Sequence, residues 1–321
     1  MSIAIPPNPN LDKVLELSRT FDDVENLEVD FSRLAFLTPA TALLLSSTLR
    51  NRDVQATMDT STPAYGYAAH VGFFEACGVH AGQAVGAARG SDSYTPLNRV
   101  VCNDVKLIAR RNKLPLPAAL TPRAENLARV VTGRNAVVMR YITYAVREIL
   151  RNCVEHARST DFWYAGQSWP TNSTVEIAVL DEGDGILTSL NRNPENPQFT
   201  TELDAIRFAI QSGVSGVATA NRRGDSANSG YGLYLTRRLC AIGSGSFAIV
   251  SNGAGMVISA SGERQLTGSS KGTLLQLRMD TDRLSALTED DFSYIVAEGE
   301  NEALERTGAA QLASNASRGL P

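Results

Sequence analysis

A carboxylate and a carboxamide, Glu148 and Asn152, lie four residues apart in a segment with the pattern of an amphipathic helix. Across residues 135–157, apolar side chains recur at intervals of three and four. Residues four apart project from the same helix face. There Asn152 can offer an oxygen to Mg²⁺ bound to phosphates, and Glu148 can accept a proton from a nucleophile. The alternative is the solvated face of an ordinary helix.

A second polar group follows a predicted strand. Residues 174–180 alternate in polarity, are rich in β-branched side chains and run directly into Asp181, followed by Gly183 and Gly185. Glycine lets the backbone take a positive φ or approach a ligand closely. An ionised carboxylate only accepts hydrogen bonds, so Asp181 suits an exocyclic amine such as that of adenine. The alternative is a turn aspartate; the spacing excludes a calcium loop.

Two further blocks lie nearer the C-terminus. Gly230 and Gly232 open a predicted amphipathic helix, and the free N–H groups at a helix start bind anions. Gly272 and Thr273 open a predicted strand that carries one hydroxyl. The third glycine of a dinucleotide fingerprint and the P-loop pattern are both absent. The information therefore lies in the order of all four blocks.

In that order the blocks resemble the GHKL ATPase domain shared by gyrase, heat-shock chaperones, histidine kinases and mismatch-repair ATPases. The resemblance extends from about residue 123 to 279, with 148–157 (E-I-L-R-N-C-V-E-H-A) similar to the N box. Residues 181–186 and 230–233 resemble the two glycine boxes. The resemblance implies an α/β sandwich, with a mixed sheet covered by helices on one face.

The resemblance also implies a role for each matching residue. Asn152 would coordinate the Mg²⁺ that accompanies ATP, Asp181 would hold the adenine amine, and Glu148 would be the general base for hydrolysis or for transfer to a hydroxyl. The other residues expected to contact the nucleotide are Gly183, Gly185, Ile186, Gly230, Gly232, Leu233 and Thr273. Residues 187–229 would form the lid, and residues 203–212 within it have the pattern of a short helix. Arg222 and Arg223 there either reach the phosphates or are two solvated surface arginines.

The N-terminal region resembles a STAS domain, the fold of bacterial anti-anti-sigma factors. Strand patterns at 27–31 and 54–58 alternate with helix patterns at 39–49 and 67–77. Those factors carry a phosphorylated Ser or Thr before the first of these helices, where this chain has only Thr38. We expect Thr38 to be a helix N-cap, with Pro39 at the first helical position, rather than a phosphoacceptor.

Length and composition fit two α/β domains. Prolines around residue 118 predict a boundary between a STAS-like domain (1–118) and the GHKL domain (119–285). Residues 286–321 would form a C-terminal helix, predicted over 287–294, and a tail that is mobile or ordered by a partner from residue 298.

Charge, cysteine content and hydropathy exclude several other classes of protein. The net charge of −4 argues against a broad nucleic-acid face, and the four scattered cysteines indicate neither a zinc site nor a disulfide framework. The most apolar run, residues 40–45, is far shorter than the roughly 20 residues that cross a bilayer. With no signal-peptide pattern at the N-terminus, we expect a cytoplasmic location and no membrane partner.

Three functions remain open at the level of sequence. The first is a Mg·ATP-dependent regulatory switch, a slow ATPase whose lid controls association with a protein partner or with a second copy. The second is a serine/threonine protein kinase of the anti-sigma type. The third is an interaction module without catalysis. A sensor histidine kinase is not favoured, because His70 and His80 lack the setting of a phosphoacceptor and His156 is expected to pack structurally.

Overall fold

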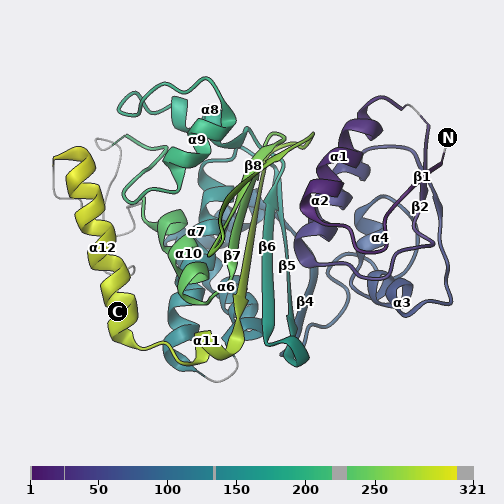
Figure 1. Cartoon of the computed structure of the whole chain (residues 1–321), viewed down its shortest axis with the longest axis horizontal. Helices are drawn as coiled ribbons and strands as arrows, with labels where there is room; N and C mark the ends of the chain where they lie inside the picture. The colour runs from purple at the N-terminus through teal and green to yellow at the C-terminus, as the bar shows by residue number, and fades with distance from the viewer. Residues whose placement is uncertain (1, 25, 133–134, 219–229, 309–321) are drawn as a thin grey trace.

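The structure is a computed structural model, and it describes residues 2–24, 26–132, 135–218 and 230–308. A large β-sheet stands in the middle of the described residues, with other elements packed on both of its faces (Figure 1). The N-terminal elements lie on one side of this sheet. Helices that carry the predicted site lie on the other side.

The central sheet has seven strands within the described residues, and every neighbouring pair is antiparallel. In spatial order they are β4 (Tyr94–Val101), β5 (Asp161–Trp169), β6 (Thr174–Asp181), β10 (Thr273–Asp280), β7 (Ser246–Ser251), β8 (Ala254–Ser259) and β9 (Gly262–Thr267). The expected mixed sheet is wrong, because tight turns join several sequential strands. Asn252 and Gly253 alone separate β7 from β8, both at positive φ, as a two-residue hairpin requires.

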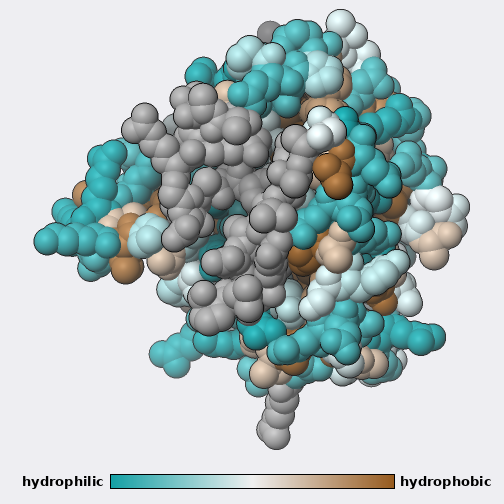
Figure 2. All heavy atoms as spheres, turned by 90° about the vertical axis from the view of Figure 1, so that its left-hand side faces the viewer, coloured by the Kyte–Doolittle hydropathy of each residue, from teal (hydrophilic) through white to brown (hydrophobic). Residues whose placement is uncertain are grey.

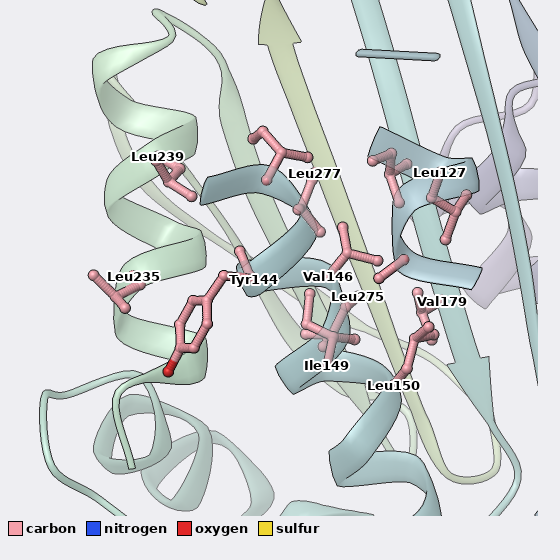
Figure 3. Packing of buried hydrophobic residues seen from close by; sticks show 14 of the residues in the cluster. Leu127, Tyr144, Val146, Ile149, Leu150, Val179, Leu235, Leu239, Leu275 and Leu277 are labelled. Carbon is pink, nitrogen blue, oxygen red and sulfur yellow. The ribbon is translucent and has the colours of Figure 1, made fainter. Parts of the chain in front are cut away.

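Three helices cover the face of the central sheet that carries the predicted site. They are α6 (Leu116–Thr132), α7 (Ala136–Glu155) and α10 (Gly232–Ile242). Helix α7 confirms the helix predicted from periodicity; the side chain of Asn135 caps it by accepting the N–H of Val137 and of Val138. Figure 3 shows how side chains of α7 and α10 meet strand residues such as Leu275 in one buried cluster.

The N-terminal elements form a second sheet of three parallel strands within the described residues. These strands and their connecting helices are β1 (Ser2–Ala4), α1 (Leu11–Asp22), β2 (Leu27–Asp30), α2 (Pro39–Leu49) and β3 (Val54–Thr57). The predicted alternation of strands and helices is present, while the likeness to a STAS domain stays a prediction. Apolar residues of α1 and α2 share one buried cluster with Trp163, Ala178 and Leu180 of the central sheet. Helices therefore cover both faces of that sheet, not one.

Helix α2 begins as the sequence predicts. Thr38 is its N-cap and forms a capping box with Thr41, with Pro39 at the first helical position. The main-chain N–H of Ala40 donates to a carboxylate oxygen of Glu176 in β6, at 2.9 Å. Glu176 is fully buried, and this burial raises its pKa. The start of α2, with its partial positive charge, therefore faces a buried acidic group of the central sheet.

Two predicted helices differ from expectation. The helix predicted over 67–77 is two helices, α3 (Pro63–His70) and α4 (Phe73–Ala76), because Gly72 between them takes a φ of +82°. The helix predicted over 287–294 is longer: α12 (Glu289–Thr307) continues beyond residue 298. Gly299 and Ala303 are buried on the inner face of this continuation. Residues 309–321 of the predicted tail lie outside the described residues.

The predicted boundary near residue 118 falls inside α6. Strand β4, at the edge of the central sheet, and α5 (Cys102–Arg111), which packs beside α6, both precede that boundary. The change from the small parallel sheet to the central sheet therefore lies between β3 and β4. Of the prolines that suggested a boundary, Pro117 lies in the first turn of α6, where proline is tolerated, and Pro122 lies inside the helix at an exposed position.

None of the helices in the described ranges combines the length and apolar character needed to cross a membrane. Figure 2 shows the side of the molecule on which α12 lies, and most of the coloured surface there is hydrophilic, with small apolar patches. Among the larger exposed apolar residues, Tyr294 and Leu304 belong to α12. The exposed apolar side chains are thus dispersed among polar ones on this side.

The packing of α2 on the sheet gives a first prediction. Leu43 is fully buried in the cluster between α2 and the central sheet. Replacing it with alanine should lower the free energy of unfolding by about 2–5 kcal/mol, because a cavity remains. Leu107→Ala, at a position 42% exposed, should change it by less than about 0.5 kcal/mol. Urea denaturation measures both, and equal midpoints for the two variants would contradict the packing described.

Candidate functional site

A pocket opens between α7, the C-terminal end of β6 and the start of α10. Its empty volume, including the part open to solvent, is about 850 Å³. The predicted site residues that line it are Glu148, Asn152, Asp181, Gly185, Ile186, Gly230, Gly232, Leu233 and Thr273. These residues come from four separate blocks of the sequence, and the fold brings them around one cavity.

Helix α7 presents Glu148 and Asn152 to this pocket from one face. Glu148 is almost fully buried, and two arginines of the same helix flank its carboxylate: the ion-pair distances are 3.7 Å to Arg151 and 3.9 Å to Arg147. Burial raises the pKa of Glu148, and the two guanidinium groups oppose that rise. A carboxylate with a raised pKa is suited to accept a proton near neutral pH.

Asp181 ends β6 and is buried at the floor of the pocket. One of its oxygens accepts the main-chain N–H of Gly183 at 2.9 Å. Burial raises the pKa of Asp181 to about 6, against the lowering effect of this hydrogen bond. Thr273 pairs directly with Asp181 across β6 and β10, so its side chain lines the same part of the pocket.

The glycines after Asp181 serve two different purposes. Gly185 lines the pocket at a φ of +80°, and a side chain there would collide with Asn252. Gly183 does not line the pocket: an added Cβ would lie 2.0 Å from the carbonyl oxygen of Ala157. Gly183 thus permits the strand exit to pack against the end of α7. The expected nucleotide contact at Gly183 stays a prediction.

The second glycine block also lines the pocket. Helix α10 starts at Gly232 without a side-chain cap hydrogen bond from Tyr231, so its first N–H groups face this region. A Cβ on Gly232 would lie 2.8 Å from the Cβ of Glu148, which brings α10 and α7 into close contact. Gly230 takes a φ of +77° beside the carbonyl oxygen of Val214. Gly230 is therefore required by its backbone conformation and Gly232 by the close approach of the Glu148 side chain, and the helix start can receive an anion.

The described part of the predicted lid contains two short helices, α8 (Gly185–Asn191) and α9 (Glu202–Ala209). The predicted helix over 203–212 is confirmed with shifted ends. Ser189, Val214 and Ser215 from this segment line the pocket, so part of the lid segment already contacts the cavity. Arg222 and Arg223 lie outside the described residues.

Two polar residues of the β7–β8 corner support the pocket and were not predicted. The hydroxyl of Ser251 accepts the N–H of Ile186 at 2.8 Å. The carboxamide of Asn252 donates to Glu202 at 2.7 Å and accepts the N–H of Gly272 at 3.0 Å. These residues link the first glycine block, the lid segment and β10. The only sequence signal was the Asn252-Gly253 hairpin dipeptide, which predicts a turn and not a site.

His156 and Cys153 also line the pocket. Burial, with Arg151 and Arg192 nearby, lowers the pKa of His156 to about 4, so this imidazole is neutral at physiological pH. Burial raises the pKa of the Cys153 thiol. Neither side chain offers a charged group or a thiolate to chemistry in the pocket. Both fit a packing role at the end of α7.

Comparison with known families agrees with this geometry. Residues 116–245 match the histidine kinase-like ATPase domain family. The matched segment begins with α6, includes both glycine blocks and ends before β7, so it does not include Thr273 or the N-terminal elements. No curated protein sequence matches the chain. The match supports a GHKL domain in this part of the chain and implies ATP binding.

The pH dependence of ATP binding tests the role of Asp181. Because the pKa of Asp181 is raised in the folded protein, its protonated carboxyl stabilises the folded state. This stabilisation is complete below about pH 3.8 and is lost as the pH rises through about 6. The ionised carboxylate is the stronger acceptor for an adenine amine. Between pH 5 and 7 the affinity of the wild type for ATP, relative to Asp181→Asn, should therefore increase about tenfold.

Isothermal titration calorimetry at both pH values measures this ratio. The titration of ATP itself is common to the two proteins and cancels when they are compared. Parallel affinity profiles for the wild type and Asp181→Asn would contradict an ionised Asp181 as the acceptor of the adenine amine.

Proposed function

We propose that this protein binds Mg·ATP and hydrolyses it slowly, as a regulatory switch whose lid controls association with a protein partner or with a second copy. The supporting observation is the convergence of Asn152, Asp181 and the start of α10 on one pocket. Each offers a different chemistry: an amide oxygen, a carboxylate that accepts hydrogen bonds, and main-chain N–H groups. A nucleoside triphosphate with its metal needs all three.

Two groups of lining residues would receive the two ends of the nucleotide. Asp181 and Thr273 lie together and would receive the adenine amine, since a buried acceptor selects for a donor. The N–H groups at Gly232 and Leu233 would receive phosphate oxygens. Gly185 and Ile186 lie beside Asp181 and would contact the base and ribose.

The donor set around the phosphate end fits Mg²⁺ better than a transition metal. The described residues contain no cluster of three or more His, Cys, Asp or Glu side chains that could hold a metal ion. Mg²⁺ takes few ligands from protein and completes its shell with phosphate and water, so the Asn152 oxygen alone suffices. When bound, the ion would neutralise phosphate charge. In the proposed site Asn152 would hold it.

Glu148 is the proposed general base. It lies one turn before Asn152, lines the pocket and has a pKa that burial raises. Its carboxylate would accept the proton of an attacking water, and Arg147 and Arg151 would hold it in place. The same geometry serves transfer to a protein hydroxyl, which is the kinase alternative. Thr38 is no substrate for its own pocket, because α2 packs on the opposite face of the sheet.

Removing the amide oxygen tests the metal-dependent part of the proposal. Asn152→Ala should abolish the component of ATP affinity that depends on Mg²⁺, leaving the weaker affinity that the wild type shows in EDTA. Calorimetric titration with and without Mg²⁺ measures both. Asn172→Ala, in the turn between β5 and β6, is a matched amide deletion away from the pocket and should bind as the wild type does. A Mg²⁺ effect retained in Asn152→Ala would exclude this residue as the ligand.

Removing the base separates binding from catalysis. Glu148→Ala should bind Mg·ATP within about threefold of the wild type while phosphate release falls at least about a hundredfold, the usual range for a general base. Phosphate-release kinetics and titration on the same sample measure the two quantities. Normal turnover by Glu148→Ala would eliminate the general-base role. Incubation with labelled ATP and cell lysate, followed by a search for labelled protein, distinguishes kinase from hydrolase.

A further inference from the structure

The N-terminal elements reach the adenine end of the pocket through Glu182, the residue directly after Asp181. The hydroxyl of Ser47 in α2 donates to a carboxylate oxygen of Glu182 at 2.7 Å. The guanidinium of Arg50, at the C-terminal end of α2, forms an ion pair with the same oxygen at 3.3 Å. Both side chains of this ion pair are largely buried, at 11% and 17% exposure. A buried ion pair is sensitive to any displacement of either partner.

Arg50 is held between this carboxylate and an aromatic ring. Its guanidinium lies 3.6 Å from the ring centre of Trp163, in the neighbouring strand β5. Two of its nitrogens, Nε and Nη1, are buried without a hydrogen-bond acceptor among the described residues. Burial lowers the pKa of Arg50, and Glu182 is the main group that opposes this. The position of Glu182 therefore governs how well the buried cation is compensated.

Alternation along β6 connects this ion pair to the pocket. Asp181 faces the pocket, whereas Leu180 faces α2, as successive residues of a strand must. Glu182 continues this alternation and faces α2. Gly272 packs against the backbone of Asp181 and of Glu182: an added Cβ would lie 2.0 Å from the carbonyl oxygen of Asp181 and 2.6 Å from the Cα of Glu182. The backbone at Asp181 cannot shift without moving Glu182.

We propose that Arg50 and Ser47 are positioning residues for the adenine end of the nucleotide site, acting on Asp181 through Glu182. The inference rests on the proposed ATP binding and assigns its regulation to α2. Occupation of the pocket by adenine fixes Asp181, which fixes Glu182 and the Arg50–Trp163 contact on the opposite face of the sheet. By thermodynamic linkage, a partner that displaces α2 changes the affinity for ATP by the same factor by which ATP changes the affinity for that partner.

The test compares two arginines at the same end of α2. Arg50→Met removes the ion pair with Glu182. Arg52→Met is the matched control, since Arg52 contacts Asp22, Phe21 and Thr48 within the N-terminal elements. Both are made in a Trp169→Phe background, which leaves Trp163 as the single tryptophan. The measurements are the Kd for ATP by calorimetry, kcat by phosphate release, and the change in Trp163 emission when ATP is added.

Arg50→Met should raise the Kd for ATP about three- to tenfold, leave kcat within about twofold and abolish the ATP-induced change in Trp163 emission. Arg52→Met should match its parent in all three. A merely structural role would lower the active fraction without changing Kd. Should Arg50→Met fail to fold, Glu182→Gln removes the charge, keeps an acceptor for Ser47, and carries the same expectations.

Equal ATP affinities for Arg50→Met and Arg52→Met, or an unchanged Trp163 response in Arg50→Met, would overturn the inference while leaving ATP binding intact. Absence of ATP binding by the parent protein would overturn the proposed function, and this inference with it.

Discussion

Strand β6 is buried on both faces, and the rest of the structure depends on that alternation. Val175, Ile177, Val179 and Asp181 point toward the helices that enclose the pocket. The intervening residues point toward the N-terminal elements; they include the fully buried Ala178 and Glu176. A shift of one residue in the register with β5 or β10 would exchange these two sets. The register therefore fixes the site and the docking of α2 together.

Burial of carboxylates is the main electrostatic feature of this arrangement. Asp181 and Glu148 face the pocket, whereas Glu176 faces α2, and burial raises the pKa of all three. Each has a different compensation: main-chain N–H groups for Asp181, two arginines for Glu148 and the start of a helix for Glu176. Buried charges persist only where such partners are in place. An incoming nucleotide would add hydrogen-bond donors at Asp181, whose carboxylate is compensated by main-chain N–H groups and not by a charged side chain.

The N-terminal elements contact β6 from the face of the central sheet opposite the pocket. On the pocket side, the segment with Ser189 and Ser215 lines the cavity. Helix α2 contacts the same strand from the other side, with its start at Glu176 and its end at Glu182. The pocket and its surroundings thus have contacts on both faces of the sheet: the segment with Ser189 and Ser215 lines the cavity, and α2 contacts the end of the strand that carries Asp181.

Much of the candidate site could be predicted from the sequence because its residues lie in short local blocks. Helix periodicity placed Glu148 and Asn152 on one face, the strand pattern ended at Asp181, and glycines marked the turns at Gly185 and Gly230. Spacing of this kind is set by the 3.6-residue and two-residue periods of backbone geometry, which act locally. Thr38 as the N-cap of α2 was predictable for the same reason.

Tertiary structure alone decided the rest. Gly183 serves the packing of Ala157 and not the pocket; Ser251 and Asn252 support the site from a distant hairpin. The pairing of β6 with β10 and the contact between Arg50 and Glu182 join residues that lie far apart in the sequence. Such contacts depend on which faces find each other when apolar surface is buried, and that depends on the whole chain at once. The sequence determined the local chemistry, and long-range packing determined what that chemistry can reach.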